Sequence, residues 1–462
     1  MTAHALPSIA SREKPTRVRA TFGKVRNGDL LTIPGRLGIP ILGVLPEAVR
    51  NPFAFTQRMY DQFGPIHRFR ACGNWNVQLV GPEANEFVLF DAESNFSAYG
   101  GWKPVFGRNF DGGLLLRDGA DHQWHRRLIA SAFKQDQLQA YLTIFARNAS
   151  RIPNRWAGRT LDIYELSQRL TFANGYMAFL GRDAELATDN DLLAFRYMMR
   201  SATAVLPWAL PGSANGRARW AKGHIARLLV PMLDREPDEE RKDLAAVLIR
   251  LHRQGLLTTD EVVAHLTFTI AASFDALSSG TVSTLYYLAR NPEWQDRLRS
   301  ELVTNVASPE HTKLEELHQC PESDWAVKEA LRLNAAAPVL WRRAVRDVEF
   351  QGHRIPTGTV TGVNPMLTHL LPELWDEPKR YNPGRFSPDL VSQRHRYAYV
   401  PFGSGAHGCL GANFASLQVR SLLRKILEGH ELMADDPREP NWYHWPNCRP
   451  IGGYGLRLVR RC

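Results

Sequence analysis

Apolar positions recur with a helical period along most of the chain. From about residue 117 to 335 they return every three or four residues, which indicates helices that each bury one face. Short alternating stretches at 65–80, 348–361 and 453–459 are typical of strands, and the first predicts a hairpin. No internal repeat and no Ser/Gly-rich linker interrupts the sequence. The pattern therefore predicts one mainly α-helical domain with small peripheral β-sheets.

One helical stretch, residues 261–289, is apolar on nearly every face. At a rise of about 1.5 Å per residue it extends roughly 43 Å, which is long enough to cross a bilayer. Asp275 stands near its centre, and a carboxylate in hydrocarbon is costly. Because a helix that is apolar all round is otherwise a core helix, we predict that this segment is buried in the protein.

The N-terminal region differs in pattern from the rest. Residues 1–28 are polar and basic and contain no apolar segment of a secretory signal. Residues 30–49 are apolar, but prolines at 34, 40 and 46 exclude a spanning helix. We expect a flexible basic arm over 1–34 and a single domain over 35–462. Packing of 30–49 on the core is the favoured interpretation, and contact with a membrane surface stays open.

The formal net charge of +10 narrows the choice of partners. A basic surface suits nucleic acid, an anionic membrane or an acidic protein, but no zinc-finger spacing or RNA-binding signature occurs. The five cysteines are scattered and include no CxxC pair, which excludes zinc-ribbon and iron–sulfur ligand sets. Their odd number favours a reducing compartment without a disulfide framework.

Residues 401–411, PFGSGAHGCLG, place one cysteine, Cys409, among four glycines. Glycine lets a backbone approach a bulky group closely and adopt positive φ. The helical pattern that follows points its N-terminus at the sulfur, which favours a thiolate. Such a thiolate can ligate haem iron axially and favour cleavage of the O–O bond. From the loop alone, the alternative is a buried structural cysteine in a glycine turn.

Glu329 and Arg332 lie three residues apart, on one face of a predicted helix. In an apolar setting both charges need pairing, and Arg385 is a candidate for a further partner. The alternative is an ordinary exposed ion pair.

Together these segments resemble the cytochrome P-450 superfamily, and the resemblance runs from about residue 35 to the C-terminus. PFGSGAHGCLG resembles the haem-binding signature FxxGxxxCxG, in which Phe402, Gly405, Cys409 and Gly411 are in register. EALR resembles the family's ExxR pair, and NPGRF its PERF segment, with Gly384 where glutamate is usual. The resemblance implies the cytochrome P-450 fold of a soluble bacterial-type member, with haem b between the long oxygen-activating helix and the cysteine-loop helix. It also implies a structural triad of Glu329, Arg332 and Arg385.

The resemblance further implies which residues hold the haem, with Cys409 as the axial iron ligand. HQWHRRLIASAF looks like the helix that carries WxxxR, with His122 at the tryptophan place and Arg126 at the arginine place. A register that starts from Trp124 fits less well. For His407 the alternative is a turn histidine that faces solvent. The full set expected to bind the cofactor is Cys409, His122, Arg126, Arg342, His407, Phe402, Gly403 and Gly411.

The stretch around Asp275 resembles the family's oxygen-activating helix, whose acid is normally followed by threonine. Here the next residue is Ala276, so the hydroxyl that positions water for proton transfer is missing. Ser279, one turn further on, can hold a water in its place. A hydroxyl on the substrate is the second option, and poor coupling, use of peroxide or a non-monooxygenase reaction is the third. We favour assistance by water or substrate, and we expect the catalytic positions to be Asp275, Ala276 and Ser279.

The function that the resemblance implies is that of a haem-thiolate monooxygenase, which inserts one oxygen atom from O2 into a C–H bond. The alternatives are a haem-thiolate enzyme that uses peroxide or is not a monooxygenase, supported by Ala276, and a haem-based sensor or carrier of a lipophilic ligand. The segments expected to line the pocket are apolar and aromatic, which favours a steroid, a terpenoid or other isoprenoid, or a fatty acid. They are 99–113, 198–212, 268–275 and 337–341.

No redox domain follows the cysteine loop, so electrons are expected from a separate protein, either a ferredoxin with its reductase or a flavodoxin-type donor. The further expectations are a monomer in the cytoplasm, with no nucleic-acid partner and no transmembrane segment. Basic residues near the thiolate are expected to dock the acidic donor. They are Arg127, Lys134, Arg420, Arg424 and Lys425.

Overall fold

The computed structural model describes residues 14–17, 19–71, 73–156, 158–181, 186–202, 204, 208–308 and 310–461. The chain divides into two compact units, of which the first is here named the helical unit and the second the mixed unit. The helical unit consists of Met1–Thr21, Ser97–Gln137 and Gly175–Ala272, and the mixed unit of Phe22–Phe96, Leu138–Asn174 and Ser273–Cys462.

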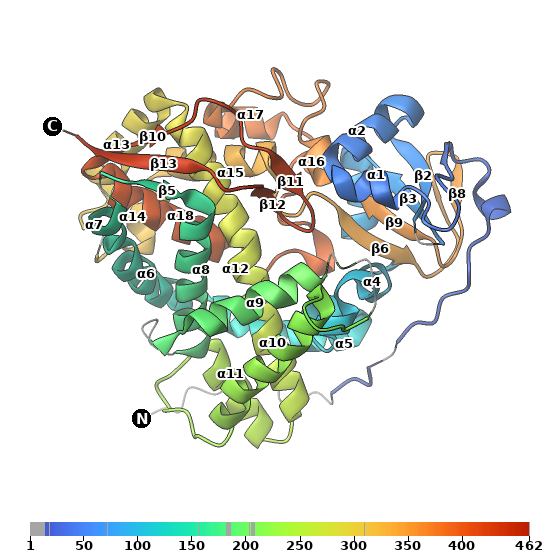
Figure 1. The fold of residues 1–462 in the computed structure, drawn as a ribbon, viewed down its shortest axis with the longest axis horizontal. Helices are drawn as coiled ribbons and strands as arrows, with labels where there is room; N and C mark the ends of the chain where they lie inside the picture. Colours follow the sequence, from blue (N-terminus) through green and yellow to red (C-terminus); the bar gives the residue numbers. More distant parts are fainter. Residues whose placement is uncertain are drawn as a thin grey trace. The chain divides into compact units, whose positions relative to one another are not determined.

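The helical unit is built from helices that follow the predicted periodicity (Figure 1). They are α4 (Ala98–Phe110), η4 (Leu114–Leu116), α5 (Gly119–Ala130), η5 (Ser131–Phe133), α9 (Asp189–Ser201), α10 (Ala214–Leu229), η7 (Val230–Met232) and α11 (Leu244–Arg253). Other elements have residues in both units, namely β4 (Phe96–Ser97), α6 (Gln135–Ser150), α8 (Ile163–Leu180) and α12 (Thr259–Ala289).

The mixed unit combines small sheets with helices. Its strands are β1 (Gly35–Arg36), β2 (Ile66–Ala71), β3 (Asn74–Leu79), β5 (Thr160–Asp162), β6 (Leu340–Ala344), β7 (Val348–Phe350), β8 (His353–Ile355), β9 (Val360–Val363), β10 (His430–Ala434), β11 (Trp442–His444), β12 (Cys448–Pro450) and β13 (Gly455–Arg460). Its helices are η2 (Asn27–Leu30), α1 (Leu45–Arg50), α2 (Pro52–Phe63), α3 (Pro82–Asn85), η3 (Glu86–Phe90), α7 (Ile152–Trp156), α13 (Pro292–Asn305), α14 (Leu314–His318), α15 (Pro321–Leu333), α16 (Pro365–Thr368), η8 (Pro383–Phe386), α17 (Pro388–Ser392), η9 (Gly405–His407) and α18 (Ala412–Leu427).

The predicted strands are confirmed. β2 and β3 pair antiparallel from Ile66↔Leu79 to Ala71↔Asn74, which is the hairpin expected at 65–80. The stretch 348–361 contains β7 and β8 and enters β9, and 453–459 overlaps β13. Because helices make up most of the described chain, the predicted mainly α class is confirmed as well.

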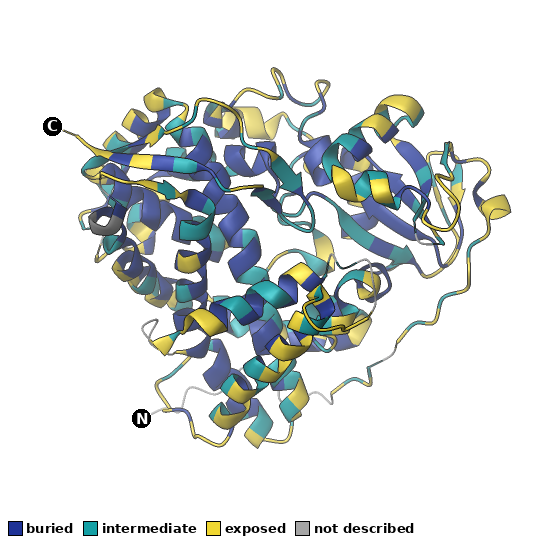
Figure 2. Ribbon diagram, viewed as in Figure 1, coloured by how far each residue is buried: buried dark blue, intermediate teal, exposed yellow. Residues whose placement is uncertain are grey.

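The largest described sheet has the strand order β1-β2-β3-β9-β6-β4. Alternation along β3 buries Val77 and Leu79 in a cluster that also holds Leu30 and Ile33. The helices α1 and α2 lie beside this sheet (Figure 1), and Phe55 of α2 meets Phe69 of β2 edge-on. Figure 2 shows buried colour through β2, β3 and β9 and exposed colour on α1. Period-two patterning therefore fixes which strand face joins the core.

Helix α12 is the long apolar helix predicted for residues 261–289. Of the helices that the structure describes, it is the one long and apolar enough to cross a membrane. Leu266, Ile270, Phe274 and Val282 are fully buried within the protein. The helix therefore has the packing of a core helix, as predicted from its apolar circumference.

The segment that leads to the cysteine loop is held by a buried ion network in the mixed unit. Glu329 and Arg332, one turn apart on α15, form a two-point ion pair with distances of 2.7 and 2.8 Å. Arg385 of η8 adds a third contact, with Nε 3.3 Å from Glu329 Oε1. Glu329 and Arg332 are fully buried, so the ion pair is shielded from water.

The remaining N–H groups of Arg332 hold backbone carbonyls of later segments. They donate to the oxygens of His369, Pro378 and Arg380, at 2.8, 2.7 and 3.3 Å. The imidazole of His369 in turn accepts the backbone N–H of Val400 at its Nε2 atom. One guanidinium thus sets the course of the chain from 369 to 400, directly before the cysteine loop.

We expect Glu329→Gln to reduce the free energy of unfolding by about 3–5 kcal/mol, because Arg332 would remain buried without its counter-charge. Chemical denaturation of the purified protein measures this change. The matched control is Glu377→Gln, which breaks an exposed ion pair with Arg380 at the same i,i+3 spacing. The control should change stability by no more than about 1 kcal/mol. Equal effects of the two substitutions would contradict the structural importance of the buried network.

The part of the N-terminal arm that belongs to the helical unit makes ion pairs within that unit. Arg17 and Arg19 both reach the carboxylate of Asp111, each at 2.7 Å. Lys14 pairs with Glu261 at the start of α12, at 2.5 Å. Three residues of the arm expected over 1–34 thus have specific partners, and residues 1–13 and 18 lie outside the described residues.

A second buried ionic cluster lies in the helical unit around α5. One terminal nitrogen of Arg117 donates to both carboxylate oxygens of Asp121, at 2.8 and 2.9 Å, and the other terminal nitrogen lies 3.4 Å from Glu261. His125 Nε2 faces the same carboxylates, 3.4 Å from Asp121 and 3.6 Å from Glu261. His265 Nε2 lies 2.9 Å from His125 Nδ1. The carboxylates favour a proton on His125 Nε2, which leaves Nδ1 to accept the N–H of His265.

Burial lowers the pKa of both histidines. For His125 the carboxylates act in the opposite sense without reversing the shift. For His265 burial lowers the pKa well below its usual value, and the neighbouring His125 and Arg117 act in the same direction. Both imidazoles are therefore neutral in the folded protein at pH 7.

This pair predicts a loss of stability as the pH falls below about 6.5. In that range the two histidines bind protons in the unfolded chain but not in the folded one. Each histidine therefore lowers the free energy of unfolding by up to about 1.4 kcal/mol for each pH unit of acidification. Calorimetric Tm values between about pH 7.5 and 5.5 should therefore fall less steeply in the His125→Gln/His265→Gln variant than in the parent. The control is His318→Gln, an exposed histidine in the mixed unit. An unchanged slope in the double variant would contradict the assignment.

Candidate functional site

Cys409 lies at the end of a tightly turned loop in the mixed unit. The loop is closed by backbone hydrogen bonds from Gly403 to Val400, from Gly408 to Gly405 and from Cys409 to Phe402, all between 2.9 and 3.0 Å. Helix α18 begins at Ala412, three residues after the cysteine. The loop is therefore ordered by its own backbone and presents the sulfur near the first turn of a helix.

Two glycines make this loop course feasible. Gly403 and Gly405 have φ values of 66° and 65°, in the region that favours glycine. A Cβ atom at Gly405 would stand 2.1 Å from the carbonyl oxygen of Leu89, so no other residue fits there without movement of the backbone. The glycines inferred from the sequence thus allow the loop to pack against η3.

Cys409 differs from the other cysteines that the structure describes, Cys320 and Cys448. Both of these are buried, and burial raises the pKa of Cys320 to about 11 and that of Cys448 further still. Cys409 is exposed. Among the described thiols, Cys409 alone is therefore accessible to a ligand that covers the loop, which fits haem ligation.

The other haem-binding residues expected in the mixed unit lie on two elements. Arg342 is buried on β6, where one of its N–H groups donates to the carbonyl of Trp341 at 2.9 Å. His407 lies half-buried on η9, two residues before the cysteine, and Phe402 and Gly403 are half-buried at the start of the loop. A thiol suits the iron of haem. A guanidinium and an imidazole suit the carboxylates of its propionates, and the mixed unit contains all three kinds of group.

His122 and Arg126 belong to the helical unit. They lie one turn apart on α5, where His122 is buried and Arg126 is half-buried. The i,i+4 spacing puts them on the same face of the helix. The expected haem residues are thus divided between the two units.

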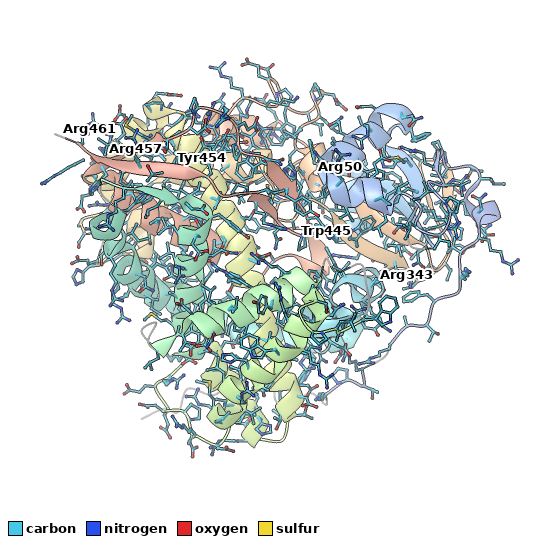
Figure 3. The ribbon with its side chains drawn as sticks, viewed as in Figure 1. Arg50, Arg343, Trp445, Tyr454, Arg457 and Arg461 are labelled. Carbon is cyan, nitrogen blue, oxygen red and sulfur yellow. The ribbon has the colours of Figure 1, made fainter. Side chains whose placement is uncertain are left out.

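The acid of the oxygen-helix motif is held by a residue that the sequence did not indicate. The side-chain amide of Asn447 donates a hydrogen bond to Asp275 Oδ2. Asn447 follows Trp445 in the turn between β11 and β12, where Figure 3 labels the tryptophan. The backbone N–H of Cys448 fixes this turn by donating to Ala336 at 3.1 Å. The partners stand 172 residues apart, so no local pattern could have revealed them.

Ser279 and Ser283 differ from other hydroxyl residues of α12. Ser278, Thr281 and Thr284 each donate to the carbonyl four residues earlier, the usual way in which a helix satisfies such groups. The buried hydroxyls of Ser279 and Ser283 have no hydrogen-bond partner in the described part of the chain, and Ser279 is the one that lies a single turn from Asp275. A buried hydroxyl of this kind is suited to hold a water molecule.

The segments expected to line a pocket contain a row of aromatic rings in the helical unit. Trp102, Phe106 and Phe110 follow one another along α4, and Phe110 meets Phe268 of α12 with ring centroids 6.0 Å apart. Residues 203 and 205–207 of the expected 198–212 segment lie outside the described residues. Trp102, Phe106 and Phe110 are buried, so this part of the helical unit is an apolar, aromatic interior.

The prediction that Arg420 and Arg424 dock an electron donor is wrong. Both are buried on α18, where Arg420 donates to Ser323 and Cys320 at 2.8 Å and Arg424 donates to Val306 at 3.1 Å. Both guanidinium groups donate hydrogen bonds inside the mixed unit, so they are not accessible to a partner protein. Lys425 pairs with Glu428 at 3.2 Å, whereas Arg127 and Lys134 of the helical unit are exposed.

Comparison with known proteins agrees with this geometry. A protein of Mycobacterium tuberculosis named "Putative cytochrome P450 136" is 30% identical over 447 residues, which cover 94% of this chain and 89% of the relative. The "Sterol 14alpha-demethylase" of Mycolicibacterium vanbaalenii is 24% identical, with 86% and 90% of the two chains covered. The structure titled "Retinoic acid bound cyanobacterial CYP120A1" has a TM-score of 0.85 at 24% identity, over 93% of this chain and 99% of the other.

The high TM-score shows that the two chains share a fold. The family model described as "Cytochrome P450" matches residues 33–447, a range that contains the cysteine loop, the Glu329–Arg332 pair and the whole of α12. The chain therefore belongs to the cytochrome P450 family, whose members are haem-thiolate monooxygenases.

Proposed function

We propose that the protein binds haem b through Cys409 and inserts one oxygen atom from O2 into a steroid, an isoprenoid or a fatty acid. The observation that carries this proposal is the exposed Cys409 at the end of a loop in which Gly405 cannot be replaced without movement of the backbone. Arg342, His407, His122 and Arg126 would hold the propionates through hydrogen bonds and charge. Phe402, Gly403 and Gly411 would shape the surface around the sulfur.

Haem, when bound, supplies the activation of dioxygen, and the protein supplies position, shielding and protons. Asp275 would carry protons into the site, and Asn447 would fix the orientation of its carboxylate. Ser279 would hold a water near that carboxylate, one helical turn along α12. This arrangement would replace the hydroxyl that Ala276 lacks, by positioning the water from a different turn of the helix.

The substrate class rests on the chemistry of the described side chains. The row from Trp102 to Phe268 offers apolar surface to a lipophilic molecule. The names of two similar proteins, a sterol demethylase and a retinoic acid-bound cytochrome, support a polycyclic or isoprenoid skeleton over a straight chain. We therefore rank sterols and isoprenoid acids above fatty acids.

We propose that electrons come from a separate acidic donor of the ferredoxin or flavodoxin type and that the protein works as a cytoplasmic monomer. Arg127 and Lys134 remain candidates for the docking of this donor, because both are exposed. A reaction driven by peroxide is the second candidate function, and Ala276 is the observation that favours it. Oxidation of substrate that depends on reduced nicotinamide and a redox partner distinguishes the first function from the second.

Replacement of Cys409 by Ser tests the cofactor assignment. We expect the reduced, carbon monoxide-bound protein to lose the absorption band of thiolate-ligated haem, while its circular dichroism is retained, because serine oxygen is a poor ligand for this iron. Cys320→Ala is the control and should keep the band. The parent protein, titrated with sterols, isoprenoid acids and fatty acids, should show a high-spin shift with one class. A folded parent protein that holds no haem would refute the proposal.

If Ser279 holds a water, its replacement should lower the share of electrons that is used to oxidise substrate, here called the coupling. Ser279→Ala should raise the share of electrons released as hydrogen peroxide severalfold, because the proton donor loses its positioned water. The dissociation constant from the spin-state titration should not change. Ser278→Ala is the matched control, since that hydroxyl is already satisfied by the carbonyl of Phe274. Unchanged coupling in Ser279→Ala, or a marked rise in coupling in Ala276→Thr, would count against compensation by Ser279.

A further inference from the structure

The apolar stretch at residues 30–49 is divided between core and solvent. Leu30, Ile33 and Val44 are buried, as expected for a segment that packs on the mixed unit. Many of its other large aliphatic side chains are exposed, and the exposure of so much apolar surface to water is unfavourable. They are Leu31, Leu37, Ile39, Ile41, Leu42 and Val49.

Residues 39–42, here called the apolar tip, are held out from the protein by a rigid neck. Ile39 and Gly43 exchange backbone hydrogen bonds of 3.1 and 2.9 Å, and Gly43 also bridges to Ala71 at the end of β2. A Cβ atom on Gly38 would stand 2.2 Å from the backbone of Gly43, so the two ends of the loop touch. The chain between them has no room to fold back and displays its side chains outward.

The tip also contains backbone strain at its most exposed residue. Ile41 has a φ of 66°, a conformation in which a β-branched side chain clashes with its own backbone. Its residue exposure is 79%. Asparagine or glycine would relieve the strain and suit water better. Burial of this isoleucine side chain in an apolar environment would be favourable, and the protein itself supplies no such environment at this position.

Exposed basic residues occur on both sides of the tip in the sequence and on α2. Arg36 and Arg58 share the single carboxylate of Glu47, at 3.3 and 2.7 Å, which leaves an excess positive charge. Arg50 is exposed at the end of α1 (Figure 3), and Lys24 is exposed on the segment that precedes the sheet. An exposed aliphatic tip together with exposed basic residues of the same unit is complementary to an anionic bilayer, whose headgroups attract the charges and whose acyl region accepts the tip.

We propose that the apolar tip inserts into the interface of an anionic lipid membrane, with Arg36, Arg50 and Arg58 against the headgroups. The aliphatic composition favours lipid over a protein partner, because protein hot spots are enriched in Trp, Tyr and Arg at their centres. The excess positive charge disfavours a second copy of this chain, which would bring like charges together. This contact does not depend on the haem chemistry of the protein.

The test measures binding of the haem-loaded full-length protein to vesicles by flotation. Vesicles of phosphatidylcholine with phosphatidylglycerol should bind the protein, and pure phosphatidylcholine vesicles should bind it much more weakly. The variant Ile41→Asn/Leu42→Glu should lower binding at least about tenfold, and Arg50→Gln about fivefold with a weaker dependence on salt. The matched control is Leu390→Asn/Val391→Glu on α17, which changes two exposed aliphatic residues of the same unit and should leave binding unchanged.

Stability provides a second readout. Ile41→Asn alone should keep or raise the Tm, because asparagine tolerates the left-handed conformation, so lost binding cannot be attributed to unfolding. Absence of vesicle binding, equal binding by the tip variant, or equal binding to both kinds of vesicle would overturn the proposal. Self-association that the tip variant abolishes, in the absence of vesicle binding, would overturn it in favour of a second copy.

Discussion

The architecture of the mixed unit depends on one fully buried guanidinium, that of Arg332. Arg332 has five N–H groups, and each of them meets an oxygen, two from Glu329 and three from backbone carbonyls. A planar, permanently charged group of this kind fixes the direction of every acceptor around it. Since those acceptors lie on α15 and on the chain between 369 and 380, their geometry determines where the following segment runs. The position of the cysteine loop follows from that course.

The proposed compensation for the hydroxyl missing at Ala276 rests on two neighbouring features of the same unit. Ala276 removes a polar group beside Asp275, while Ser279 introduces one a turn later and does not satisfy it internally. Asn447 orients the carboxylate from a separate hairpin, itself fastened to the segment after α15. In the proposed function, proton supply would combine side chains from two distant segments and would therefore be sensitive to movement of the β11–β12 hairpin.

The proposed membrane contact and the proposed substrate class belong together physically. Lipophilic molecules such as sterols and isoprenoids partition into bilayers, so an enzyme that rests on a membrane meets them at a higher local concentration than in water. The apolar tip gives this contact without a spanning helix, because it is short and rigid and inserts only side chains. A rigid tip also loses little conformational freedom when it docks.

The sequence by itself determined the elements and the local motifs. Helical and alternating periods revealed α12 and the β2–β3 hairpin, and the spacing of glycines around Cys409 and of Glu329 from Arg332 indicated the tight cysteine loop and the ion pair. These features are encoded over a few residues, where backbone geometry alone relates the side chains.

Only the tertiary structure decided which of several similar side chains face the interior. Arg420 and Arg424 carry the charge expected of a docking surface, yet both satisfy backbone carbonyls inside the mixed unit. Asn447 meets Asp275 across 172 residues, and Ile41 is exposed although Ile33, eight positions earlier, is buried. Burial and partner choice depend on contacts between segments far apart in the chain, and no periodicity within one segment records those contacts.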